Sequence, residues 1–385
     1  MTDLQKRSLF KVAALSALAA AAMVGCGKKE EPAPAPAPAP AAEAPAPKPE
    51  PLKIAFAYVG PVGDGGWSFA HDNGRKAIEK EFGDKVVTSF VESVPESADA
   101  ERVIRDLARQ GHQLIFTPSF GYMEPTLKVA QDYPNVKFES ITGYKTTANV
   151  ATANARYYEG RYLAGIAAGR MSKTGVAGFV AGFPIPEVLQ GINAFALGMR
   201  SVNPQAMVKV VWLNVWFDPP KERDAAMALF NQDVDVIAFH TGSTAVMAAA
   251  QERGKMAVAY HSDMRRTGPD AQIVAITHQW GNYYTERVRA VQNGSWKSGN
   301  VWGGVREGMI RVGDFGSRVP AAVQKEVLAA QKAVGAGRLH PFRAGNAAVR
   351  DNEGHEVIPA GQTLSDQQIL QMNWLAEGVQ GKLQR

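Results

Sequence analysis

The feature of this sequence that most restricts its fold is an alternation of short apolar runs with longer amphipathic segments, which begins at Leu52. Short apolar runs that end at Gly or Pro predict strands, and segments with apolar residues at helical spacing predict helices. Strands separated by helices predict a parallel sheet with helices on both faces. The first series has strands at 53–59, 86–91, 114–117 and 137–142, and helices at 68–82, 98–110 and 122–132.

The same alternation begins again at Gly175. Its strands are expected at 175–181, 208–215, 236–240, 257–260 and 273–277, and its helices at 186–201, 221–231 and 243–253. Two series of similar length predict an α/β protein with two Rossmann-like lobes, which are joined by a hinge and separated by a cleft.

The domain bounds follow from where each series begins and ends. Residues 52–152 and about 278–312 are assigned to the first lobe, residues 153–277 and about 313–345 to the second lobe, and residues 346–385 to a C-terminal appendage. Within the appendage we expect a hairpin over 349–358 and a helix over 365–378. The sequence of the appendage indicates no chemistry of its own.

The residues before the first lobe have the composition of an export segment. Three basic residues within the first eleven positions precede an apolar, Ala-rich stretch over 12–24, and Cys26 follows. This order predicts a signal peptide over residues 1–25. Met23-Val24-Gly25-Cys26 resembles a bacterial lipobox, with Met where Leu is commonest. The resemblance implies cleavage before Cys26 and lipidation of its thiol, and an ordinary signal peptide with a coincidental cysteine is the alternative.

Residues 26–51 form a linker in which Ala and Pro predominate. Pro restricts φ and lacks a backbone donor, so such a tract does not build a core. At about 3.1 Å per residue its extended part could reach roughly 60 Å. We therefore expect a tether that holds the folded body close to a membrane. Cys26 is the one cysteine of the chain, so no intramolecular disulfide is expected.

Several functional classes are disfavoured by composition and motifs. The formal net charge is +5 and no block of five or more Lys or Arg occurs, which argues against nucleic acid as a partner. The sequence contains no G-x-S-x-G, Walker-A or H-E-x-x-H motif. We therefore expect a binding protein rather than an enzyme, without a cofactor. His240, His261 and His278 follow strands and could converge on a metal, but for His261 we favour a hydrogen-bonding role.

The expected binding site lies just beyond the carboxyl ends of the strands, where open α/β sheets bind ligands. Aromatic residues recur there, and we expect Trp67, Trp216 and Trp280 to contact the ligand rather than to fill the core. One of Phe120 and Tyr122 is expected to line the pocket. The full set of expected contacts is Tyr58, Asp64, Trp67, Phe120, Tyr122, Asn154, Trp216, Gly242, His261, Asp263 and Trp280. For Asp263, a ligand contact and a cap of the next turn are equally consistent with the sequence.

These strand-end segments resemble the basic membrane protein family of periplasmic binding proteins, the purine-uptake lipoproteins of the type I fold. The resemblance extends from about Leu52 to Gly313 and rests on Asp64-Gly-Gly-Trp67-Ser68, Gly178-Phe-Val-Ala-Gly-Phe183, Val202-Asn-Pro204, Trp216-Phe217-Asp218-Pro219 and His261-Ser262-Asp263. It implies a monomeric, cell-envelope protein that delivers a purine to the permease of an ABC importer. In the family, aromatic rings from both lobes sandwich the purine, and Trp67 and Trp216 occupy those two positions.

Three departures from the family pattern bear on the ligand. His261 stands where nucleoside-binding members carry an Asp for the ribose hydroxyls, Trp280 where they carry a Lys near the sugar, and Tyr58 where they carry an Asp. These replacements remove charged sugar contacts and add bulk. They favour a free base such as adenine, hypoxanthine or xanthine. A nucleoside, or a sensory lipoprotein without a transporter, is the alternative.

Overall fold

The computed structural model describes residues 50–63 and 65–383. The expected signal peptide, Cys26, nearly all of the linker and Asp64 lie outside the described residues. Among the helices that the structure describes, none has both the length and the apolar character that a membrane span requires.

The first sheet has six parallel strands in the order β11-β5-β4-β3-β1-β2. Its strands are β1 (Leu52–Ala57), β2 (Val86–Val91), β3 (Leu114–Pro118), β4 (Lys137–Ile141), β5 (Val150–Ala155) and β11 (Asn300–Gly303). Its helices are α1 (Trp67–Phe82), α2 (Ala98–Arg109), α3 (Met123–Asp132) and α8 (Trp280–Gln292), with short 3₁₀ turns at η1 (Gly83–Lys85) and η2 (Phe120–Tyr122).

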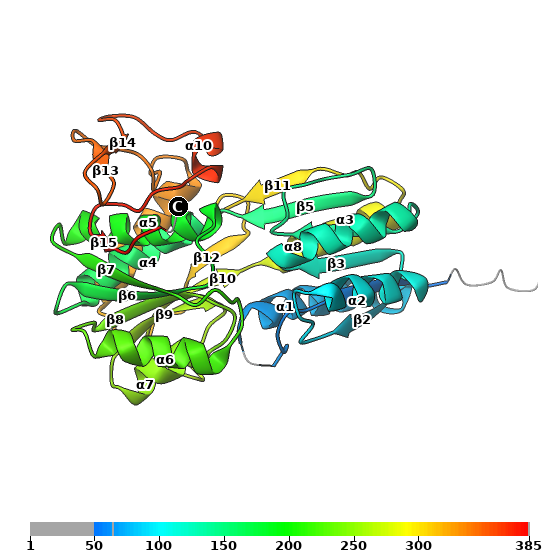
Figure 1. The fold of residues 1–385 in the computed structure, drawn as a ribbon, viewed down its shortest axis with the longest axis horizontal. Coiled ribbons are helices and arrows are strands. Elements are labelled where there is room, and N and C mark those ends of the chain that lie inside the picture. Colours follow the sequence, from blue (N-terminus) through cyan, green and yellow to red (C-terminus); the bar gives the residue numbers. More distant parts are fainter. Residues whose placement is uncertain (1–49, 64, 384–385) are drawn as a thin grey trace, which may run out of the picture. The chain divides into compact units, whose positions relative to one another are not determined.

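Two helix pairs cover this sheet, α1 with α8 and α2 with α3 (Figure 1). Side chains alternate along a strand, so Ile54 and Phe56 of β1 join the core with α1 and α8. The intervening Ala55 and Ala57 pack in the cluster formed with α2 and α3. The strand is therefore buried on both faces, which explains why its sequence is a nearly continuous apolar run.

The second sheet has the order β12-β10-β9-β8-β6-β7-β15, and β12 is its one antiparallel strand. Its strands are β6 (Val176–Ala181), β7 (Met207–Trp212), β8 (Val236–His240), β9 (Met256–His261), β10 (Gln272–His278), β12 (Ile310–Gly313) and β15 (Val379–Gln380). Its helices are α4 (Tyr157–Met171), α5 (Pro186–Val202), α6 (Pro219–Phe230), α7 (Ala245–Glu252) and α9 (Ala321–Gly335). In Figure 1, α4 and α5 lie on one side of the sheet, and α6 and α7 lie on the other.

The two predicted series do not include β5, α4, α8, β11, β12 or α9. In α4 most residues are buried, against α5, α9 and the second sheet. A helix that is apolar on every side shows no amphipathic pattern, so periodicity does not reveal it.

Small residues bring α4 and α5 close together. A Cβ on Gly165 would lie 2.3 Å from the carbonyl oxygen of Phe195, and one on Gly198 would lie 2.1 Å from that of Tyr162.

Within the described residues, the chain passes between the two sheets three times. β5 leads to α4 through Arg156, β10 leads to α8 through Gln279, and β11 leads to β12. Hydrogen bonds tie these crossings together, because the Arg156 N–H donates to Gly303 at 2.7 Å and the Gln279 N–H donates to Met309 at 2.9 Å. The predicted α/β fold of two lobes joined by a hinge is confirmed. β12 pairs in the second sheet, so residues 310–312 lie with the second lobe rather than with the first.

The C-terminal segment differs from expectation in one element. The hairpin is present as β13 (Val349–Arg350) and β14 (Glu356–Ile358), which pair antiparallel. The helix expected over 365–378 is wrong, since α10 covers only Asp366–Leu370. The residues after Leu370 contact α5 and do not continue the helix. The Asn193 side chain donates to the Trp374 carbonyl at 2.8 Å and accepts from the Ala376 N–H at 2.8 Å. This anchoring leads the chain into β15, beside β7.

Candidate ligand-binding pocket

A pocket lies between the lobes at the carboxyl ends of strands from both sheets. The space inside it that no atom fills, including space open to solvent, is about 410 Å³. The residues that line it are Val59, Trp67, Ser119, Phe120, Thr142, Glu187, Trp216, His240, Thr241, Gly242 and His261. The sequence expectation included five of them: Trp67, Phe120, Trp216, Gly242 and His261.

Trp67 is the first residue of α1 and brings the first lobe to the pocket. Its indole N–H donates to the carbonyl oxygen of Pro118 at 2.7 Å, which holds the ring at the end of β3. Its backbone N–H donates across the cleft to the carbonyl oxygen of Gly242 at 3.1 Å. The rings of His71 and His261 meet the indole edge-on, with centroids at 4.3 and 5.6 Å. Trp67 therefore has a restricted orientation and joins the two lobes.

Trp216 comes from the second lobe, four residues after β7. Phe183 packs against its ring edge-on, with centroids 4.9 Å apart. A Cβ on Gly182 would lie 2.6 Å from the indole ring, so only glycine there lets Trp216 take this position. The two tryptophans that the resemblance paired thus line one pocket from opposite lobes.

Glu187 supplies the pocket's carboxylate. It lies in the first turn of α5 and its side chain is 14% exposed. The Asn154 side chain, from β5 of the first sheet, donates to one carboxylate oxygen at 2.6 Å. The Nε2 atom of His240 lies 3.3 Å from the other oxygen. Asn154 was expected to contact the ligand, and in this structure it contacts Glu187 instead and is not among the lining residues.

His261 ends β9 in a strained backbone conformation, with φ of +80°. A non-glycine residue in this region costs about 1–3 kcal/mol, and such strain concentrates at functional sites. Nε2 of its ring lies 2.7 Å from the carbonyl oxygen of Thr241, and Nδ1 is buried without a partner among the described residues. Burial holds the pKa of His261 well below its usual value, so the ring is neutral at pH 7. Thr142, which also lines the pocket, has φ of +67°.

His240, His261 and His278 do converge, with the rings of His261 and His278 5.1 Å apart. Tyr260 lies among all three, at centroid distances from 4.1 to 5.1 Å. Burial lowers the pKa of each imidazole. In the part of the chain that the structure describes, no group of three or more His, Cys, Asp or Glu side chains is arranged to hold a metal ion.

Three of the expected contacts, Tyr58, Tyr122 and Trp280, lie in the hydrophobic core. Tyr58 continues the side-chain alternation of β1 and packs beside Phe56, with ring centroids 5.8 Å apart. Tyr122 is fully buried and its hydroxyl donates to the carbonyl oxygen of Val94 at 2.5 Å. Neither tyrosine side chain lines the pocket, because each is directed into a layer between sheet and helices.

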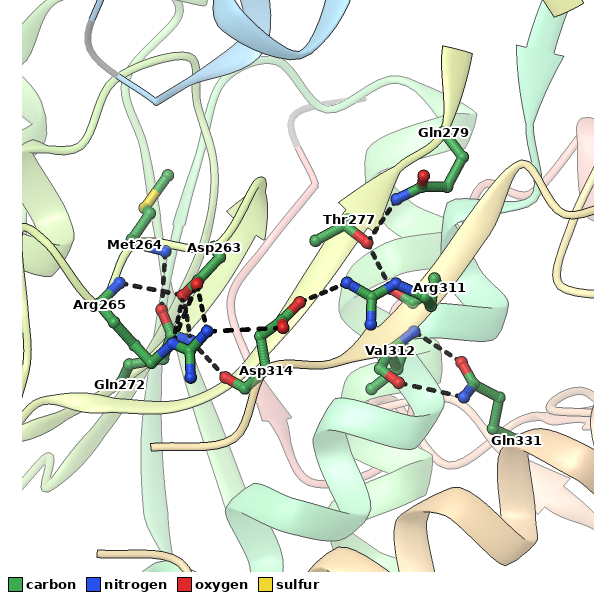
Figure 2. Close-up of polar contacts among 10 residues, drawn as sticks. All are labelled: Asp263, Met264, Arg265, Gln272, Thr277, Gln279, Arg311, Val312, Asp314 and Gln331. Carbon is green, nitrogen blue, oxygen red and sulfur yellow. Dashed lines mark hydrogen bonds and ion pairs between the residues drawn. The ribbon is translucent and has the colours of Figure 1, made fainter. Parts of the chain in front are cut away.

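Trp280 and Asp263 also lie away from this pocket. Trp280 begins α8 and is 2% exposed, stacked on His71 with ring centroids 4.8 Å apart. Asp263 is bound to Arg265 and accepts from the Gln272 side chain at 2.9 Å (Figure 2). Both line a neighbouring hollow instead. Asp64 lies outside the described residues.

Six lining residues were missed by the sequence reasoning. Val59, Ser119, Thr142, His240 and Thr241 each lie at, or within two residues of, the end of a strand, so the strand-end rule could have found them. Glu187 lies six residues beyond β6 and inside a helix, where an acidic residue is ordinary. No local pattern distinguishes it.

The fold and pocket define a class. Two α/β lobes with parallel strands, joined by a hinge of three crossings around an inter-lobe pocket, are the architecture of a periplasmic-type solute-binding protein. The sequence model of the Bmp family, described as PnrA-like ABC transporter substrate-binding proteins, matches residues 52–337. The chain therefore belongs to this family of ABC transporter substrate-binding proteins, and the resemblance seen in the sequence is confirmed.

Individual relatives agree with this assignment. A purine-binding protein of Brucella abortus is 48% identical over 332 residues, which cover 86% of this chain and 94% of that protein. A protein of Haloferax volcanii, provisionally named an ABC transporter glucose-binding protein, is 38% identical over 332 residues, which cover 86% and 81%. A solute-binding protein structure from Aeropyrum pernix K1 has a TM-score of 0.65 at 21% identity, over 75% of this chain and 93% of that one, and shows the fold alone.

Proposed function

We propose that this protein captures a purine, preferably a free nucleobase such as adenine, and delivers it to the permease of an ABC importer. One observation carries the proposal. Trp67 and Trp216, from opposite lobes, line the same inter-lobe pocket. A flat heterocycle gains from stacking on aromatic faces, by about 1–3 kcal/mol for each face. The 48% identity to a protein named for purine binding supports the same ligand class.

Hinge closure is the proposed means of capture. Among the described residues, three hydrogen bonds span the lobes around the pocket: Trp67 to Gly242, Ser262 to Gly65, and Asn154 to Glu187. All three would break if the lobes separated, and a ligand that touches both lobes favours the state in which they form. We propose that the closed, loaded form is the one presented to the permease.

The preference for a base over a nucleoside rests on His261. A carboxylate at its position could accept hydrogen bonds from two ribose hydroxyls, whereas Nε2 of His261 is occupied by the Thr241 carbonyl. Any ribose hydroxyl that finds no acceptor in place of such a carboxylate would cost about 1–3 kcal/mol. Trp280 lies outside the pocket wall, so its bulk does not restrict the ligand there.

Export and anchoring complete the proposal. The basic and apolar N-terminal segment, Cys26 and the Ala-Pro linker fit a lipoprotein that is tethered to a membrane outside the cytoplasm and works as a monomer. A sensory lipoprotein of the same fold would need the same pocket and no permease. Uptake of labelled purine by cells with and without the gene distinguishes the two.

Calorimetric titration with adenine, hypoxanthine, adenosine, inosine and glucose tests the ligand class. We expect both bases to bind, with adenine at least about tenfold tighter than adenosine, a ratio that corresponds to about 1.4 kcal/mol. Nucleoside binding as tight as base binding would remove the base preference and leave the purine assignment. Binding of glucose alone would overturn the purine proposal in favour of the ligand for which the Haloferax relative is named.

A further inference from the structure

The carboxylate of Glu187 is held in one orientation from two sides. Asn154 accepts from the backbone N–H of Ala155 through its amide oxygen, at 2.8 Å, so its amino group is the part that reaches Glu187. Burial lowers the pKa of His240 although Glu187 opposes the shift, and Nε2 of its ring lies 3.3 Å from the second oxygen. Each carboxylate oxygen can accept more than one hydrogen bond. Glu187 therefore keeps acceptor capacity on its accessible side.

Each hydroxyl group that lines the pocket already donates its proton to another group of the protein. The Thr142 hydroxyl donates to the carbonyl oxygen of Ile141 at 2.6 Å. The Thr241 hydroxyl donates to Glu222 at 2.8 Å, and the Ser119 hydroxyl donates to a carboxylate outside the pocket. A hydroxyl has a single proton, so these three groups offer a ligand lone pairs and no donor. Among the described lining residues, Glu187 is the one acidic side chain, and none is Lys or Arg.

We propose that Glu187 contacts the edge of the stacked ring and selects an exocyclic amino group at position 6, so that the pocket prefers a 6-aminopurine to a 6-oxopurine. The inference rests on the proposed purine function. An exocyclic amino group donates to the carboxylate, whereas a carbonyl oxygen in the same place faces its lone pairs. Sites with a buried polar group discriminate strongly against an analogue that leaves this group unpaired. Asn154 and His240 act as positioning residues for Glu187.

A ligand series on the unaltered protein tests the donor requirement first. Adenine, N6,N6-dimethyladenine and hypoxanthine are titrated by calorimetry. We expect adenine to bind at least about tenfold more tightly than the other two, since only adenine presents an exocyclic N–H. Because this comparison needs no variant, it holds even if changes at Glu187 prevent folding.

The variant Glu187→Gln then assigns the effect to this residue. The amide has the same shape as the carboxylate and can turn a donor toward a carbonyl oxygen. We therefore expect the affinity for adenine to fall by about tenfold or more, and the affinity for hypoxanthine to fall less or to rise. The matched control is Glu124→Gln. Glu124 is also an acid in a first helical turn, but it lies at the surface, paired with Lys145, and outside the pocket. The Glu124→Gln variant should bind adenine and hypoxanthine as tightly as the unaltered protein does.

The outcomes separate this inference from the function on which it rests. An adenine-to-hypoxanthine ratio that falls in Glu187→Gln and stays constant in Glu124→Gln supports the assignment. A ratio that is unchanged, or an equal loss for both bases, overturns it and leaves purine binding intact, because a residue with a merely structural role would weaken both ligands alike. Wild-type protein that binds neither base refutes the purine function and this inference together.

Discussion

The indole N–H of Trp67 donates to the carbonyl oxygen of Pro118 at 2.7 Å, so a first-lobe ring at the pocket wall is attached to the end of β3. A ring that is already immobilised loses little conformational entropy when a ligand stacks on it. Trp67 can therefore contribute to ligand affinity in two ways, through its aromatic face and through the fixed orientation of its ring. A change to Ala removes both, so a second substitution is needed to tell them apart.

Trp67→Phe and Trp67→Ala should therefore differ. Trp67→Ala removes the face and is expected to weaken purine binding by about 1–3 kcal/mol. Trp67→Phe keeps an aromatic face but loses the bond to Pro118, and should fall between Trp67→Ala and the unaltered protein. Calorimetry with adenine measures both. Equal affinity in all three proteins would show that Trp67 does not stack on the ligand.

Trp216 and Trp280 should respond in opposite ways to the same substitution. Trp216 lines the pocket and is partly exposed, so Trp216→Ala should weaken binding by about 1–3 kcal/mol with a small effect on unfolding. Trp280 is buried beneath α1, and Trp280→Ala should lower the free energy of unfolding by about 3–5 kcal/mol. Chemical denaturation and calorimetry on both variants make the comparison. The assignment fails if Trp280→Ala proves stable and Trp216→Ala unfolds.

Ligand-driven closure should be visible in solution. The Ser262 hydroxyl, in the second lobe, donates to the carbonyl oxygen of Gly65 in the first lobe. We expect small-angle scattering to give a smaller radius of gyration with saturating adenine than without it. Ser262→Ala should bind more weakly because the closed state loses one contact, by about 0.5–1.5 kcal/mol. An unchanged radius on saturation would favour a rigid binding module.

The membrane anchor is tested at Cys26, which lies outside the described residues. Exported wild-type protein should partition with membranes into detergent, and Cys26→Ser should remain uncleaved or be released. Mass spectrometry of the mature N-terminus reports the lipid directly. A Cys26→Ser protein that still carries lipid would rule out the lipobox interpretation.

Periodicity was enough to predict the fold, because most strands and helices in both lobes carry local signals. Three of the elements it missed have local explanations. α4 is buried along most of its length and lacks a polar face. The strands β11 and β12 are only four residues each and lie on either side of the third crossing between the sheets. The helix expected over 365–378 failed because tertiary contacts with Asn193 replaced helical hydrogen bonds beyond Leu370.

The site was predicted less completely, for a geometric reason. The strand-end rule locates a pocket along the chain but does not say which way a side chain points. Tyr58 and Trp67 both follow β1, yet Tyr58 turns into the core while Trp67 reaches the cleft. Glu187 could not be found from sequence, since its role depends on Asn154 and His240, which are 33 and 53 positions away.

Stability should fall as the solution becomes mildly acidic, because four buried imidazoles are held neutral. Burial lowers the pKa of His71, His240, His261 and His278. In the unfolded chain these groups titrate near pH 6.5. Above about pH 7.5 neither state binds these protons and stability is flat. As pH falls below about 6.5, only the unfolded chain takes up protons, so the folded state loses stability.

Each such imidazole contributes at most about 1.4 kcal/mol per pH unit, so the slope grows with the number of rings that stay neutral in the folded state. Buried carboxyls such as Glu139, whose pKa burial raises, act in the opposite sense at lower pH. Urea unfolding between about pH 7.5 and 5.5 measures the slope. His278→Leu should reduce the slope by up to about 1.4 kcal/mol per pH unit, which is the contribution of one proton. Both ring nitrogens of His278 are buried without partners among the described residues. A flat profile across this range would mean that the four rings are protonated in the folded state.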